Sequence, residues 1–233
     1  MRDFPFRCAA FDMDGTLLDS MSFWREAAAH YLQSHGVCEN MDVLRARLRE
    51  MSSLASMDFI RPICEAAHIP PMQRADLMRH LEACYRTRAV AKPGIPTFLA
   101  ELRRAGIPMC VATATPEALA RVALRKAGIL DDFAFILTPE TYPKGKSDRA
   151  FFDGISARFG VPLRDIAVVE DALYSIRTAK SVGCYCIGAA EDYSAAQQAE
   201  LRALCDAFYD FSVDPPVSVR TKNAESAKTG SAF

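Results

Sequence analysis

The sequence contains no long hydrophobic run and no marked excess of charge of either sign. No apolar run approaches the roughly 20 residues needed to span a bilayer. The N-terminal segment MRDFPFRCAAFDMDG also lacks the extended apolar stretch of a secretory signal. The 28 basic and 29 acidic residues leave a formal net charge of -1, which gives no reason to expect a nucleic-acid or membrane-surface partner. We therefore expect a cytoplasmic protein that binds neither a membrane nor a nucleic acid.

The eight cysteines include no Cys-x-x-Cys pair, and the four histidines show no metal-ligand spacing among themselves. Several cysteines lie in apolar runs, among them Cys8, Cys110, Cys184 and Cys186. Such positions are typical of small buried hydrophobic side chains in a reducing compartment. The cysteine spacing therefore favours neither a zinc site nor a disulfide framework.

Short apolar runs alternate with helical patterns through most of the chain. The strands are expected at 7–13, 108–114, 133–138, 166–171 and 184–189. Three of the helical patterns close on a glycine, at Gly106, Gly128 and Gly183, where a left-handed C-terminal cap is expected. This alternation predicts an α/β fold with a parallel sheet and helices on both faces.

One region interrupts the alternation. Between about Ser20 and Lys92 the pattern predicts helices and no strand, and Pro62 is expected to bend or split the third of these helices. We therefore predict a core formed by residues 1–19 and 92–213, with an all-α insert at residues 20–91. The C-terminal segment 214–233 is polar and aperiodic, which predicts a disordered tail.

Polar side chains follow four of the predicted strands. They are Asp12 and Asp14, Thr113 and Thr115, Lys144 and Lys146, and Glu170 and Asp171. Ligands bind at the carboxyl ends of strands in an open parallel sheet. Clustered acids need a compensating cation, and a hard divalent ion such as Mg²⁺ prefers their oxygens. Asp12, Glu170 and Asp171 are the candidate ligands, and the lysine and threonine groups suit an anion, so the set predicts a phosphoryl site.

The spacing of Asp12 and Asp14 predicts two different roles. Residues two apart in an extended segment point to the same side, so both carboxylates can reach one substrate. One carboxylate can attack phosphorus and form an aspartyl phosphate, while the other protonates the leaving oxygen and then activates water. Gly15 allows the chain to turn away sharply after the pair.

Four stretches of this sequence resemble, in order, the four motifs of the haloacid dehalogenase-like (HAD) hydrolase superfamily. They are FDMDGTLLDS, VATAT, GKSDRAFF and VVEDALYSIRTAKSVG. The overall pattern is similar to the branch that contains β-phosphoglucomutase and small-metabolite phosphatases, and it extends from about Phe6 to Gly188. The resemblance implies a Rossmann-like core, an α-helical cap, Mg²⁺ and an aspartyl-phosphate intermediate.

The resemblance also implies roles for individual acids. Asp12 matches the nucleophile of the family, and Asp14 matches its general acid/base. Glu170 and Asp171 match the metal-binding pair, and Asp12 and the main-chain carbonyl of Asp14 complete the implied metal site.

The phosphate-binding positions follow in the same way. Thr113 matches the hydroxyl that binds the transferring phosphoryl group, with the amide of Ala114 beside it. Lys146 matches the lysine of the third motif, whereas Lys144 requires a shift of one residue. Ser147, Arg149 and Ala150 replace the usual proline, proline and aspartate of that motif.

The function we predict is a Mg²⁺-dependent phosphatase of a small phosphorylated metabolite, such as a sugar phosphate or a nucleotide-like compound. The acid at Asp14 disfavours a dehalogenase, and the absence of any lysine before Lys92 disfavours a phosphonate hydrolase. A hexose-phosphate mutase of the β-phosphoglucomutase type stays open as the alternative, with Arg49 in the stretch REMSSLASM as the candidate for a second phosphate. A non-catalytic phosphate-sensing module is less favoured, because no core acid is lost.

Overall fold

The structure of the chain is a computed structural model that describes residues 4–218 except 38, 49–50, 52 and 192–194. The chain divides into two compact units, residues 1–19 together with 90–233, and Ser20–Ala89. We call the first unit the core and the second the insert, and describe each by itself. The predicted insert, residues 20–91, differs from the compact unit by two residues at its second boundary.

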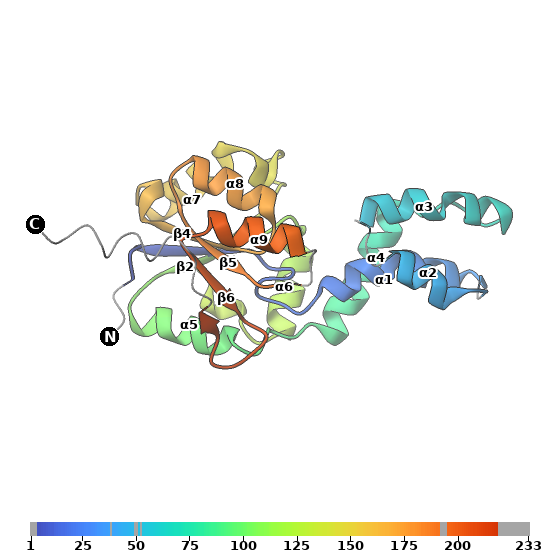
Figure 1. Cartoon of the computed structure of the whole chain (residues 1–233), viewed down its shortest axis with the longest axis horizontal. Coiled ribbons are helices and arrows are strands. Elements are labelled where there is room, and N and C mark those ends of the chain that lie inside the picture. Colours follow the sequence, from blue (N-terminus) through green and yellow to red (C-terminus); the bar gives the residue numbers. More distant parts are fainter. Residues whose placement is uncertain (1–3, 38, 49–50, 52, 192–194, 219–233) are drawn as a thin grey trace, which may run out of the picture. The chain divides into compact units, whose positions relative to one another are not determined.

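The core is built on one sheet of seven strands (Figure 1), in the order β3-β2-β1-β4-β5-β6-β7. The strands are β1 (Cys8–Phe11), β2 (Met109–Ala112), β3 (Ile136–Leu137), β4 (Ile166–Glu170), β5 (Tyr185–Ala189), β6 (Ala207–Asp210) and β7 (Val217–Ser218). All neighbouring pairs from β3 to β6 are parallel, and only β7 pairs antiparallel, with β6. β1 lies between β2 and β4. These two strands are separated in the sequence by β3, among other elements, but they flank the same strand in the sheet.

Helices cover both faces of this sheet. The helices of the core are α5 (Ile95–Arg104), α6 (Glu117–Lys126), α7 (Arg149–Phe159), α8 (Leu173–Ser181) and α9 (Ala195–Leu204), with short 3-10 turns η1 (Leu130–Asp132), η2 (Gly145–Ser147) and η3 (Leu163–Asp165). Alternate residues of a strand face opposite sides. Cys8 and Ala10 belong to the hydrophobic cluster that α7 and α8 complete, whereas the ring of Phe11 lies 6.1 Å from that of Phe98 in α5. The predicted α/β fold with a doubly covered parallel sheet is confirmed.

The end of the core departs from the prediction in one respect. Residues 207–210 form β6 and Val217–Ser218 form β7, although neither strand was expected from the sequence. Segment 214–233 was predicted to be disordered, and this is incorrect for Val217 and Ser218, which pair with Asp210 and Tyr209. The exposed edge of β6 offers backbone groups that the chain satisfies by turning back on itself. Residues 219–233 of the predicted tail lie outside the described residues.

The described residues of the insert form helices joined by turns and loops, with no strand. It consists of α1 (Met21–Ser34), α2 (Met41–Leu48), α3 (Ser53–Ala66) and α4 (Arg74–Arg88), and α1 packs against each of the other three. α3 continues through Pro62, so this proline does not split the helix as the sequence suggested it might. The indole N–H of Trp24 in α1 donates a 3.2 Å hydrogen bond to the hydroxyl of Tyr85 in α4, which ties the two helices together.

Seven cysteines fall within the described residues, and all of them are buried and free. The three glycines expected to cap helices all have positive φ, between 69° at Gly106 and 89° at Gly183. The expected burial of Cys8, Cys110, Cys184 and Cys186 and the expected conformation of the three glycines are thus confirmed. Within the described residues, no helix has the length and apolar character needed to cross a bilayer.

Candidate active site

The carboxyl ends of β1, β2 and β4 lie together, because β2 and β4 both pair with β1. Asp12 follows β1 directly, and its backbone N–H donates to the carbonyl oxygen of Val169 in β4 at 2.9 Å. β4 itself ends on Glu170, which Asp171 follows. The parallel pairing of two strands therefore brings acids from distant parts of the sequence to one edge of the sheet.

Three of these acids form a buried cluster. Asp12, Glu170 and Asp171 each offer a carboxylate oxygen, and these oxygens lie within 4.8 Å of one another. Burial, followed by repulsion from Glu170, raises the pKa of Asp12 well above its ordinary value. Clustered, buried carboxylates are stable as anions only beside compensating cations. The oxygen-only donor set is the kind that Mg²⁺ prefers, so the site has the chemistry of a hard-metal site.

Lys146 is the cation of this cluster. Its Nζ lies 2.5 Å from Asp12 Oδ1 and 2.6 Å from Glu170 Oε2, and only 5% of the residue is exposed. Burial alone lowers the pKa of Lys146, but the Asp12 and Glu170 carboxylates outweigh it and raise the pKa well above its ordinary value, so the ammonium stays charged. Lys144 points elsewhere, with a side chain 81% exposed and paired with Asp148 at 3.3 Å. Of the two candidate lysines, the structure brings only Lys146 to the acids.

Glu170 also fixes the loop that follows β4. Its Oε1 accepts the backbone N–H groups of Asp171 at 3.1 Å and Ala172 at 3.0 Å, just before α8 begins at Leu173. These two bonds fix the backbone of the short segment that leads into the helix. The same carboxylate therefore holds Lys146 with one oxygen and the start of α8 with the other.

Asp14 is held by a tight turn and by a threonine. Gly15 has a φ of 86°, which is unfavourable for residues with a Cβ, and its N–H donates to the carbonyl oxygen of Leu18 at 3.1 Å. The hydroxyl of Thr115, which follows β2, donates a 2.7 Å hydrogen bond to Asp14 Oδ2. Asp14 is half-buried, whereas Thr115 is fully buried. The turn fixes the backbone next to Asp14, and the bond from Thr115 fixes its carboxylate.

The sequence did not assign the orienting roles of two threonines. The hydroxyl of Thr16 donates a 2.9 Å hydrogen bond to Asp171 Oδ1, and Thr115 orients Asp14 as described above. The hydroxyl oxygen of buried Thr113 accepts the backbone N–H of Thr115 at 3.1 Å, so these two positions form one small network. Ala114, between them, is exposed. Hydroxyls at the ends of predicted strands were the only signal in the sequence for these contacts.

The family of haloacid dehalogenase-like hydrolases matches residues 6–183, which is most of the chain. The chain belongs to this family. Its relatives include validoxylamine A 7'-phosphate phosphatase of Streptomyces hygroscopicus subsp. limoneus, with 28% identity over 85% of this chain and 92% of that protein. They also include β-phosphoglucomutase of Bacillus subtilis, with 27% identity over 78% and 82%, and phosphoglycolate phosphatase of Vibrio cholerae, with 27% over 79% and 84%.

The fold agrees with this membership. The crystal structure of a "putative beta-phosphoglucomutase" from Thermotoga maritima superposes with a TM-score of 0.73, covering 88% of this chain and 95% of that one at 21% identity. The resemblance seen in the sequence motifs is thus confirmed, and so is the prediction that this hydrolase is an enzyme acting on phosphoric monoesters.

Proposed function

We propose that this hydrolase is a Mg²⁺-dependent phosphatase of small phosphorylated metabolites that works through a phosphorylated Asp12. The single observation that carries the proposal is the buried cluster in which Lys146 contacts Asp12 and Glu170 while Asp171 lies beside them. The relatives named as phosphatases support the reaction class.

The fit of Mg²⁺ rests on the charge and the donors of the cluster. Three buried carboxylates face one lysine, so the site carries an excess of negative charge that a divalent cation would compensate. Asp12 and Asp171, with Glu170 and the main-chain carbonyl of Asp14, would hold the ion. When bound, the ion would neutralise negative charge on the phosphoryl oxygens. Glu170 already accepts two hydrogen bonds at Oε1 and one at Oε2, so Oε2 retains a lone pair that could reach the ion.

In the first step, an oxygen of Asp12 forms a bond to the phosphorus of the substrate while the bond to the leaving oxygen breaks. The Asp14 carboxyl gives its proton to that leaving oxygen, so the released product is an alcohol. Lys146 and the hydroxyl of Thr113 stabilise the charge on the phosphoryl oxygens. The cationic Lys146 also opposes the rise that burial and Glu170 cause in the pKa of Asp12, and so favours its anionic form.

In the second step, Asp14 accepts a proton from water as the water oxygen attacks the phosphorus of phosphorylated Asp12. The bond between phosphorus and the Asp12 oxygen breaks, which releases inorganic phosphate and returns Asp12 as a carboxylate. Asp14 is again protonated and ready for the next substrate. The bond from Thr115 keeps its carboxyl aimed at the same place in both steps.

The substrate class follows the named relatives, which act on phosphorylated small molecules, including validoxylamine A 7'-phosphate and phosphoglycolate. We infer a small phosphorylated organic alcohol, of the sugar phosphate or phosphoglycolate kind. A mutase needs a second phosphate contact, and its candidate, Arg49, lies outside the described residues. The phosphatase is the function we propose, because two of the three relatives described above are named as phosphatases.

A panel of phosphorylated metabolites, incubated with the protein and Mg²⁺, tests this function. We expect release of inorganic phosphate in amounts equal to the alcohol product. Conversion of a hexose phosphate to its isomer without net release of phosphate would instead establish a mutase. No turnover of any panel member, together with no turnover of p-nitrophenyl phosphate, would contradict both.

A further inference from the structure

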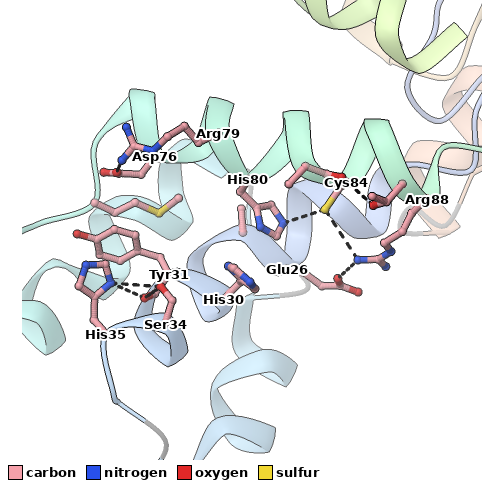
Figure 2. Close-up of a pocket in the computed structure, with 14 residues that line it drawn as sticks. Glu26, His30, Tyr31, Ser34, His35, Asp76, Arg79, His80, Cys84 and Arg88 are labelled. Carbon is pink, nitrogen blue, oxygen red and sulfur yellow. Dashed lines mark hydrogen bonds and ion pairs between the residues drawn. The ribbon is translucent and has the colours of Figure 1, made fainter. Parts of the chain in front are cut away.

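A pocket of about 460 Å³ lies between α1 and α4, and all of its lining residues belong to the insert. Figure 2 shows that histidine, cysteine, arginine and carboxylate side chains line it. Among the lining residues are Glu26 and His30 of α1, and His80, Cys84 and Arg88 of α4. None of these side chains takes part in the proposed reaction, so the proposed function does not account for the chemistry of this pocket.

The spacing of these groups follows one pattern on both helices. Glu26 and His30 are four residues apart on α1, and His80 and Cys84 are four residues apart on α4. Residues four apart lie on the same side of a helix. Each helix therefore presents one pair of potential metal ligands to the pocket (Figure 2). Carboxylate, imidazole and thiolate groups are the ligands that Zn²⁺ takes in proteins.

One pair of these donors, on α4, already has the separation that a zinc site requires. His80 Nε2 lies 3.5 Å from Cys84 Sγ. In a tetrahedral zinc site with bonds of about 2.3 Å to sulfur and about 2.1 Å to nitrogen, those two ligand atoms are about 3.6 Å apart. The ring of His30 lies 4.7 Å, between centroids, from the ring of His80. One edge of a coordination polyhedron is thus already formed, with a second imidazole next to it.

A cation already stands between two of the donors. Nη1 of Arg88 donates to Glu26 Oε2 at 3.2 Å and to Cys84 Sγ at 3.9 Å, and its guanidinium lies 4.7 Å from the centre of the Phe23 ring. The place between a carboxylate and a thiol thus favours positive charge. A metal ion that used both Glu26 and Cys84 would displace Arg88, which is half exposed and can turn to solvent.

We propose that His30, His80 and Cys84, with Glu26 as the fourth donor, form a Zn²⁺-binding site that joins α1 to α4 within the insert. Binding requires that the exposed ring of His30 turn toward Cys84 and that Arg88 leave Glu26. The thiol proton of Cys84 passes to solvent as the sulfur–metal bond forms. Mg²⁺ is a poor occupant because it prefers an all-oxygen octahedral site. The proposal is independent of the proposed function of the core.

Absorption spectroscopy with Co²⁺, a coloured substitute for Zn²⁺, tests the site on the full chain. The titration is done with excess Mg²⁺, so that the acid cluster of the core is occupied. We expect a thiolate-to-cobalt charge-transfer band that saturates at about one ion per chain, together with the visible bands of four-coordinate cobalt. All of these bands should disappear when Zn²⁺ is added. Cys84→Ser should remove the charge-transfer band. Cys64→Ser is the matched control, because Cys64 is a buried cysteine of the insert that does not line the pocket.

Two further variants have opposite expected effects. His80→Ala should weaken Co²⁺ binding by at least about tenfold. Removal of a residue that only supports a metal ligand already weakens metal binding by about tenfold or more, and His80 is proposed as a ligand itself. Arg88→Met, which keeps an apolar stem over Phe23, should strengthen binding, because it removes the competing cation. Zn²⁺ should raise the melting temperature of wild type and of Cys64→Ser.

The absence of a thiolate band in wild type at saturating Co²⁺ would overturn the proposal, as would a band that survives Cys84→Ser. If Cys84→Ser does not fold, the wild-type spectrum and the Arg88→Met titration decide. Unchanged or weaker binding in folded Arg88→Met would contradict the proposed arrangement of donors.

Discussion

Replacing Thr115 with valine removes the hydroxyl that donates a 2.7 Å hydrogen bond to Asp14 Oδ2. Valine keeps the β-branched shape of threonine at this buried position, but its methyl group cannot replace the hydrogen bond of the hydroxyl. The backbone N–H of Thr115, which donates to Thr113, is unaffected. The substitution therefore tests the orientation of Asp14 with little other change to the site.

The expected magnitude follows from the charge and burial of Asp14. A hydrogen bond to a charged group contributes about 1.5–3 kcal/mol, but Asp14 is half-buried, so water can replace part of the lost bond. We therefore take the lower end, about 1.5 kcal/mol, which corresponds to a loss of about tenfold in kcat/KM. The loss in kcat/KM should be largest for substrates whose leaving oxygen cannot depart without the proton of Asp14.

The assay compares two substrates of Thr115→Val. We expect kcat/KM to fall by about tenfold for an alkyl phosphate such as a sugar phosphate, and by much less for p-nitrophenyl phosphate, whose leaving group departs without a proton. Thr115→Ser keeps the hydroxyl and should restore the wild-type ratio between the substrates. An equal loss on both substrates would mean that Thr115 has a structural role only, and would refute this reasoning.

Three other predictions concern the acids, the metal and the thiols. In a denaturant titration, Lys146→Met should lower the free energy of unfolding by about 3 kcal/mol, because it leaves buried carboxylates uncompensated. Mg²⁺ should restore part of the lost stability. Lys144→Met, the control at an exposed position, should change the free energy of unfolding by less than about 0.5 kcal/mol. Removal of divalent ions by a chelator should abolish phosphate release and Mg²⁺ should restore it, whereas full activity in chelator would contradict the metal requirement. Burial raises the pKa of Cys184 and Cys205 to about 12, so both thiols should resist a maleimide at pH 8 until the chain unfolds. Rapid labelling of either thiol in the native protein, measured by peptide mass spectrometry, would contradict their burial.

The sequence predicted those parts of the fold that depend on local pattern. The strands β1 to β5 are short runs of apolar residues, and β1, β2 and β4 are buried along their whole length, which makes the runs continuous. β6 escaped detection because most of its residues are only half-buried, and β7 because it has only two residues. α3 passes through Pro62 in spite of the local rule, since packing in the insert outweighs the cost of one proline.

The acids of the site were predicted because they follow strands directly, whereas their supporting contacts were not. Thr16 and Asp171 are 155 residues apart in sequence, and Thr115 and Asp14 are 101 apart. Only the parallel pairing of the sheet brings such residues together, and no local pattern encodes it. The His80 and Cys84 pair was missed for another reason, because the histidines and the cysteines each lack a metal-binding spacing when they are considered separately.

The central claim is that Asp12 carries the phosphoryl group during turnover, and rapid quenching in acid tests it most directly. With p-nitrophenyl phosphate, whose good leaving group makes the first step fast, we expect a burst of p-nitrophenol of about one equivalent per chain. Peptide mass spectrometry of the quenched protein should find the phosphoryl group on Asp12, and Asp12→Asn should show neither burst nor adduct. Sustained turnover by Asp12→Asn, or a kinetically competent phosphoryl group on any other residue, would contradict the account.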